Sequence, residues 1–109
     1  MDTFNIKKND TKPYLAVTLQ DSEGDAIDLT DASIQFNLGS STDYSNVHSA
    51  AVTITDATNG KCEYRWDGTN DTNTVGSFFG EFQVTFSDGK IMTLPSDHSL
   101  NIRIFEDYD

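Results

Sequence analysis

Apolar and polar side chains alternate along much of the chain with a period of two, which indicates half-buried β-strands. The clearest run lies between Tyr14 and Gln20, where every second residue is a large aliphatic one. Similar runs follow at residues 26–29, 34–38, 47–54, 62–66, 76–86, 90–94 and 100–104. No segment has the longer period of an extended amphipathic helix. The pattern therefore predicts an all-β chain of about eight short strands.

Turn-forming residues separate most of the predicted strands. Pro13 precedes the first strand, where a proline removes no interior hydrogen bond of a sheet. Asn59 and Gly60 form a dipeptide that tolerates the positive φ angles of tight hairpin turns. We therefore expect the strand that ends at Ile54 to pair with the strand that begins at Cys62 as a β-hairpin.

The alternation also predicts which side chains form the core. On the longest strand, Phe78, Phe82 and Phe86 share one face, whereas Phe79 lies on the other. We expect Phe79 either to be covered by a loop or to contact another subunit. The predicted core residues are Leu15, Val17, Leu19, Ile34, Phe36, Tyr64, Trp66, Phe82, Val84, Phe86 and Ile102.

Strands with one apolar face bury those faces most simply when two sheets pack against each other. The chain of 109 residues is long enough for one such core. We expect a single domain over residues 1–109, an immunoglobulin-like two-sheet β-sandwich of about seven to eight antiparallel strands, with a small barrel as the alternative. Trp66 could be the central core tryptophan, but Cys62 is the only cysteine, so the disulfide of antibody domains has no counterpart.

The charge of the chain restricts its partners. There are 18 acidic and 7 basic residues, a formal net charge of −11. A surface of that sign repels phosphate backbones and anionic lipid heads, so we expect neither nucleic acid nor a membrane as a partner. The acidic residues stand mostly in predicted turns, where we expect them to be solvated. Because the N-terminal segment lacks the apolar run of a signal peptide, we expect synthesis in the cytosol without secretion.

No residue pattern predicts catalysis or a cofactor. His48 and His98 stand far apart, and neither has a second ligand at zinc spacing, so surface histidines are the simpler interpretation. The consecutive residues Ser96, Asp97 and His98 do not make a triad, which requires convergence in space. The glycines follow strand and turn positions and form no phosphate-binding loop. We therefore expect no enzyme activity and no small-molecule substrate.

One loop is rich in oxygen ligands that calcium prefers. The candidate calcium residues are Asp67, Asn70, Asp71 and Asn73. Their spacing differs from that of an EF-hand loop. Turn residues that hydrogen-bond their own backbone explain the loop better, so a metal site is not the favoured interpretation.

Two other functions are alternatives to a structural role. Tyr64, Trp66 and Phe79 could form an aromatic platform for a sugar, as in carbohydrate-binding β-sandwich modules, although core positions are favoured for Tyr64 and Trp66. The acidic surface could also mimic DNA as a decoy. Such a decoy needs carboxylates spaced like phosphates along one face, whereas here they lie mainly in turns.

Three stretches together resemble small phage and prophage virion proteins, and in particular the N-terminal domain of phage baseplate upper proteins. The stretches are Phe4-x-Ile6 with Asn9-Asp-Thr-x-Pro13; Ile27-Asp-Leu-Thr30-x-Ala32-x-Ile34-x-Phe36; and Gly60-x-x-x-Tyr64-x-Trp66 followed by Gly76-x-x-x-Gly80-Glu-Phe82-x-Val84-Thr-Phe86-x-Asp88-Gly89 and Thr93-x-Pro95. The resemblance implies an immunoglobulin-like sandwich in the tail or baseplate of a virion. It also implies several copies that contact other phage structural proteins or each other, and it supplies no catalytic residues.

Overall fold

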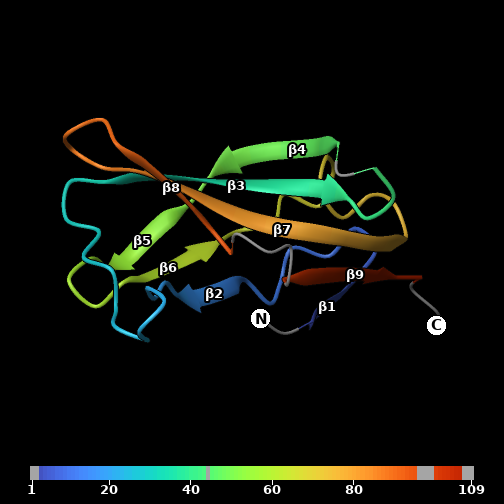
Figure 1. The fold of residues 1–109 in the computed structure, drawn as a ribbon. Helices are drawn as coiled ribbons and strands as arrows, with labels where there is room; N and C mark the ends of the chain where they lie inside the picture. Colours follow the sequence, from blue (N-terminus) through green and yellow to red (C-terminus); the bar gives the residue numbers. More distant parts are fainter. Residues whose placement is uncertain (1–2, 44, 96–99, 107–109) are drawn as a thin grey trace.

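Two β-sheets pack face to face in the computed structural model of the chain, which describes residues 3–43, 45–95 and 100–106 (Figure 1). The described residues contain no helix that could cross a membrane. The strands are β1 (Thr3–Lys7), β2 (Leu15–Thr18), β3 (Ser33–Ser40), β4 (Asn46–Ala51), β5 (Thr53–Asp56), β6 (Lys61–Tyr64), β7 (Gly76–Thr85), β8 (Ile91–Leu94) and β9 (Asn101–Phe105).

The larger sheet is organised around the long strand β7. Its order is β1-β9-β7-β3-β4, and β8 also pairs with β7. Strand β3 runs antiparallel along one side of β7. On the other side, β9 pairs with the first half of β7 and β8 with the second half. The smaller sheet has the order β2-β6-β5, with antiparallel pairs.

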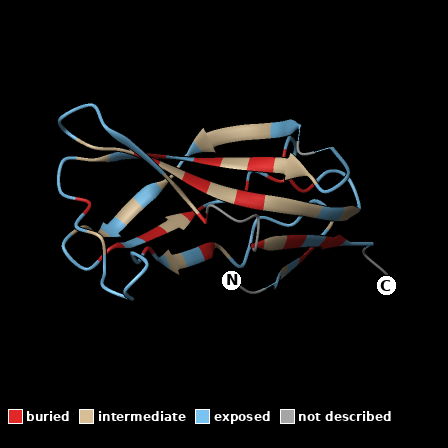
Figure 2. Cartoon of the chain, in the orientation of Figure 1, coloured by how far each residue is buried: buried red, intermediate tan, exposed pale blue. Residues whose placement is uncertain are grey.

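Aromatic rings fill the space between the sheets. Phe36 of β3 stacks on Tyr64 of β6 with ring centroids 4.5 Å apart, and Phe36 also contacts Phe82 of β7. Trp66 meets Phe36 and Tyr64 edge to face and stacks on Phe4 of β1. No described acceptor reaches the buried Nε1 of Trp66, so ring packing holds this side chain in place. In Figure 2, which colours buried residues red, most of the buried stretches fall on strands of the two sheets.

The predicted sandwich is confirmed, and so is most of its predicted core. Nine of the eleven core residues are buried. Val17 and Phe86 are only partly buried, although both pack against the core. Val17 lies on β2, an edge strand of the smaller sheet, and Phe86 follows the last residue of β7. Each of these two side chains therefore has neighbouring strands on fewer sides, which leaves part of it exposed.

The strand predictions needed three corrections. Residues 47–54 form two strands, because the chain leaves the larger sheet at Val52 and joins the smaller one at Thr53. Residues 26–29 form no strand. Ala26 makes only an isolated bridge with Gln20, although Leu29 is buried in the core. Strand β1 is additional and makes nine strands in the described residues. It pairs with β9 in parallel, so the strands are not all antiparallel.

The predicted hairpin between β5 and β6 is confirmed. Gly60, the last residue before β6, has a φ of 69°, and its carbonyl accepts a hydrogen bond from the Leu19 amide. A Cβ atom at this position would lie 2.7 Å from the carbonyl oxygen of Leu19. The hairpin therefore needs glycine both for its backbone angle and for its close contact with the segment that follows β2.

Candidate functional site

The outer face of the larger sheet carries mostly uncharged polar side chains. Residues two apart on a strand share a face, and the pairing of β3, β4 and β7 places their outward residues side by side. Glu81 is the one charged residue among the outward positions at the centre of these strands. The outward residues at the centre of β3, β4 and β7 are Ser33, Gln35, Asn37, Ser49, Ala51, Phe79, Glu81, Gln83 and Thr85. In a chain of net charge −11, this face is nearly neutral.

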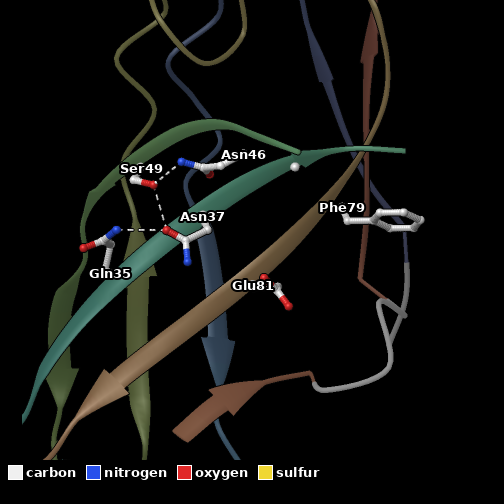
Figure 3. Close-up of a pocket in the computed structure, with 7 residues that line it drawn as sticks. Gln35, Asn37, Asn46, Ser49, Phe79 and Glu81 are labelled. Carbon is white, nitrogen blue, oxygen red and sulfur yellow. Dashed lines mark hydrogen bonds between the residues drawn. The ribbon is translucent and has the colours of Figure 1, made fainter. Parts of the chain in front are cut away.

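A hollow of about 330 Å³ lies on this face, over β3, β4 and β7 (Figure 3). Its volume is at the lower end of the range of small-molecule sites, about 300–1,000 Å³. The register brings Asn37 opposite both Ser49 and Glu81, so three strands contribute to its floor. The lining residues are Gln35, Asn37, Gly39, Asn46, Ser49, Phe79 and Glu81.

Three hydrogen bonds fix the polar side chains of the hollow. Gln35 Nε2 and Ser49 Oγ both donate to Asn37 Oδ1, over 3.0 and 2.8 Å. Asn46 Nδ2 donates to Ser49 Oγ over 2.9 Å. The side-chain oxygen of Asn37 therefore already accepts two hydrogen bonds. Figure 3 shows the side-chain nitrogen of Asn37 on the side toward Glu81. The Asn37 amide nitrogen donates to no described residue, and the Glu81 carboxylate accepts from none.

The chemistry of the hollow favours binding over catalysis. It presents amide N–H donors, one carboxylate acceptor and the half-buried ring of Phe79 at one end. Acid–base chemistry such as glycoside hydrolysis uses two carboxyl groups, whereas Glu81 is the one titratable group in the lining. This arrangement can hold an uncharged polar ligand but provides no pair of groups to exchange protons with it.

A second cluster lies where the loop after β6 meets β4. The ligand atoms of His48, Asp67 and Asp71 all lie within 4.8 Å of one another. His48 Nε2 is 4.0 Å from Asp67 Oδ2. Imidazole nitrogen and carboxylate oxygen atoms are ligands for several divalent cations. The sequence did not predict this grouping, because His48 reaches it from a distant strand.

Asp71 is the structural centre of that loop. Its side chain is only 2% exposed, and its carboxylate accepts hydrogen bonds from the Tyr64 hydroxyl and from the backbone amides of Asp67, Gly68 and Thr72. The prediction that the turn carboxylates are solvated is therefore wrong for Asp71. Burial, the hydrogen bond to Asp71 and the charge of Asp71 raise the pKa of Tyr64 far above its ordinary value.

The four candidate calcium residues separate into two groups. Asp67 and Asp71 come together, and Asp67 Oδ1 accepts the backbone amides of Thr69 and Asn70. Asn70 donates its side-chain amide to Asp67, while Asn73 is exposed and shares no hydrogen bond with the other three residues. The N–H of Asn70 is the main cause that lowers the pKa of Asp67 to about 2. These bonds support the interpretation that the loop residues hydrogen-bond to their own backbone. A cation at Asp71 would have to compete with the four donors that already bind its carboxylate.

The structure places the remaining sequence candidates as follows. Tyr64 and Trp66 are buried, so they form no aromatic platform at the surface. Phe79 lies half-buried on the outer face, beside the hollow, and its expected cover, a loop or another subunit, stays a prediction. His48 lies on β4, within the predicted strand 47–54, and its side chain is half-buried. Ser96, Asp97 and His98 lie outside the described residues.

Comparison with known proteins identifies the fold but no family. No family profile matches the chain, and no curated protein matches it in sequence. The structure is similar to CopC from Methylosinus trichosporium OB3b, with a TM-score of 0.53 over 96% of this chain and 85% of that chain. The sequence identity is 14%, a level at which the likeness establishes the β-sandwich fold alone. The resemblance to phage baseplate proteins stays a prediction.

Proposed function

We propose that the chain is a non-enzymatic structural module of a phage or prophage virion, placed in the tail or baseplate, that contacts other virion proteins and copies of itself. The observation that carries this proposal is a pair of exposed apolar patches at opposite ends of the larger sheet. The sequence resemblance supplies the virion context, and the patches supply a physical means of assembly.

The first patch lies where β7 begins and β9 ends. Val75 is 45% exposed and Phe105 is 39% exposed. They are neighbours, because Gly76 pairs with Ile104. Together with Lys7, Arg103 and other residues they line a hollow of about 490 Å³. The Arg103 guanidinium lies 5.0 Å from the centre of the Phe105 ring, so a basic group borders this apolar surface.

The second patch lies on β8, at the other end of β7. Ile91 is 60% exposed on the outer face, opposite Thr85, whereas Met92 is 39% exposed on the other face, opposite Val84, so this patch wraps around the edge strand. Ile91 pairs with Thr85, the last residue of β7, whereas the first patch flanks Gly76, the first residue. Ten residues of strand, at about 3.3 Å each, separate the patches by roughly 30 Å. That distance is a large part of the 45 Å long axis of the molecule.

Two different apolar patches at opposite ends favour a head-to-tail contact between modules. Such heterologous contacts generate rings or stacks, the arrangements from which repetitive particles are built. The open edge strand β4, which carries the exposed Val47, offers a further contact by strand pairing. A module of this kind requires no catalytic group.

Mass spectrometry of purified particles tests this proposal. Particles from the encoding phage or induced prophage should contain this chain in several copies, in amounts proportional to known tail or baseplate proteins. Its absence from clean particles that retain their tails would overturn the proposal.

A further inference from the structure

We propose that the hollow over β3, β4 and β7 binds an uncharged saccharide through Asn37 and Glu81. This inference goes beyond the proposed function, because a module that only assembles a particle needs no small ligand. It uses the centre of the outer face and not the apolar patches at the ends of the sheet. The juxtaposition of a free amide donor and a free carboxylate, both held by neighbouring strands, carries it.

The pairing of these two groups matches a sugar hydroxyl. A hydroxyl group accepts one hydrogen bond and donates another. Asn37 Nδ2 offers N–H donors toward the side of Glu81, and Glu81 offers carboxylate oxygens that accept from no described residue. Adjacent hydroxyls of a sugar ring can therefore bond to both residues at once. Gln35 Oε1 and Asn46 Oδ1 add two further acceptors at the rim.

The charge and polarity of the hollow exclude other ligand classes. An anion would face Glu81 and the negative field of a chain with net charge −11. A bound cation would find one carboxylate among amide N–H groups, which is an unfavourable mixture. An apolar ligand would bury amide and hydroxyl groups without hydrogen bonds, which is costly. A neutral molecule with many hydroxyls avoids all three costs.

The amide and serine side chains of the hollow are ordered before any ligand arrives. The Asn37 carbonyl is held by Gln35 and Ser49, and Ser49 is held in turn by Asn46. A ligand therefore loses little free energy in ordering these side chains. Phe79 borders one end and offers apolar carbon atoms to the C–H groups of a sugar ring. The volume of about 330 Å³ suits one or two rings.

Glycan-array screening followed by titration of the best ligand tests the site. The wild-type chain should bind at least one neutral glycan. Asn37→Ala should weaken its affinity about tenfold, which is the usual effect of losing about one good hydrogen bond. Glu81→Gln keeps the size of the side chain and replaces one acceptor oxygen by a donor, so it should weaken binding several-fold.

Gln83→Ala is the matched control. Gln83 lies on the same strand and face, two residues beyond Glu81, but does not line the hollow. This variant should bind within about twofold of wild type, and circular dichroism should show that all three variants are folded. Three results would overturn the proposal: no glycan bound by the folded wild type, equal binding by Asn37→Ala and Glu81→Gln, or an equal loss in Gln83→Ala. A fourth would be loss of self-association in Asn37→Ala without any glycan binding, since the face would then be a protein contact.

Discussion

Tyr64 and Asp71 join the aromatic core to the loop that closes one end of the sandwich. The Tyr64 ring packs between the sheets, while its hydroxyl donates to the buried Asp71 carboxylate. The same carboxylate accepts three backbone amides of residues 67–72. A buried charge costs free energy unless it is well hydrogen-bonded, so each of these donors stabilises the loop. Asp71 thus has a structural role, whatever the neighbouring His48 contributes.

Tyr64→Phe should reduce the free energy of unfolding by about 1.5–3 kcal/mol, the usual effect of losing a hydrogen bond to a charged group. Urea denaturation of the wild-type and variant chains measures this difference. Tyr14→Phe is the control, because Tyr14 is partly exposed and its hydroxyl bonds to no described residue. Equal stability of the two variants would show that the Tyr64 hydroxyl does not hold Asp71.

Asp67 makes the stability of the fold depend on acid pH. Its pKa falls from an ordinary value of 3.8 to about 2, first because the Asn70 amide donates to it. A carboxylate with a lowered pKa stabilises the fold fully above pH 4 and loses that contribution as the pH falls toward 2. Asp67→Asn should therefore show a smaller loss of stability between pH 4 and pH 2 than wild type. Parallel pH profiles in urea melts would contradict this assignment.

The hairpin of β5 and β6 is an element that the sequence predicts correctly, because its signal is local. Asn59 and Gly60 lie directly before β6, and Gly60 adopts the positive φ that glycine favours in turns. The change of sheet between β4 and β5 has no such signal, since the alternation continues through Val52. The pairing of β1 with β9 joins the two ends of the described chain, and only the complete fold brings them together.

The candidate sites were harder to predict than the elements. His48 and Asp67 lie on separate elements, and no spacing in the sequence connects them. Asn37 and Glu81 are outward polar residues, which in a sequence look the same as ordinary solvated positions. Only the register of β3 with β7 places them side by side. The pattern therefore predicts which faces are buried, but not what the exposed faces do.

Gly60→Ala should destabilise the hairpin more than Gly24→Ala does. Both glycines have positive φ, 69° at Gly60 and 86° at Gly24, so both variants carry a conformational cost of about 1–2 kcal/mol. A Cβ atom at Gly60 would also press on the Leu19 and Ile27 carbonyls, whereas one at Gly24 would meet nothing within 4 Å. We expect an additional loss of about 1–3 kcal/mol at Gly60 in thermal or urea melts. Equal losses would show that the contact with Leu19 is not restrictive.

At the scale of the whole molecule, charge and apolar surface act in opposite directions. A net charge of −11 keeps copies of the chain apart in dilute solution. The patches around Val75 with Phe105 and Ile91 with Met92 favour contact at the ends of the molecule. Assembly should therefore depend on those ends, and salt should promote it by screening the repulsion.

Co-sedimentation of the chain with purified particles is the most direct test of this account. Wild type should sediment with particles, whereas Val75→Asp and Ile91→Asp should each be incorporated at least several-fold less, because a carboxylate in an apolar contact is costly. Thr18→Asp, an exposed change on β2 opposite Lys61, should be incorporated like wild type. Wild type that stayed in the supernatant, or folded patch variants that sedimented as well as wild type, would contradict assembly through these two patches.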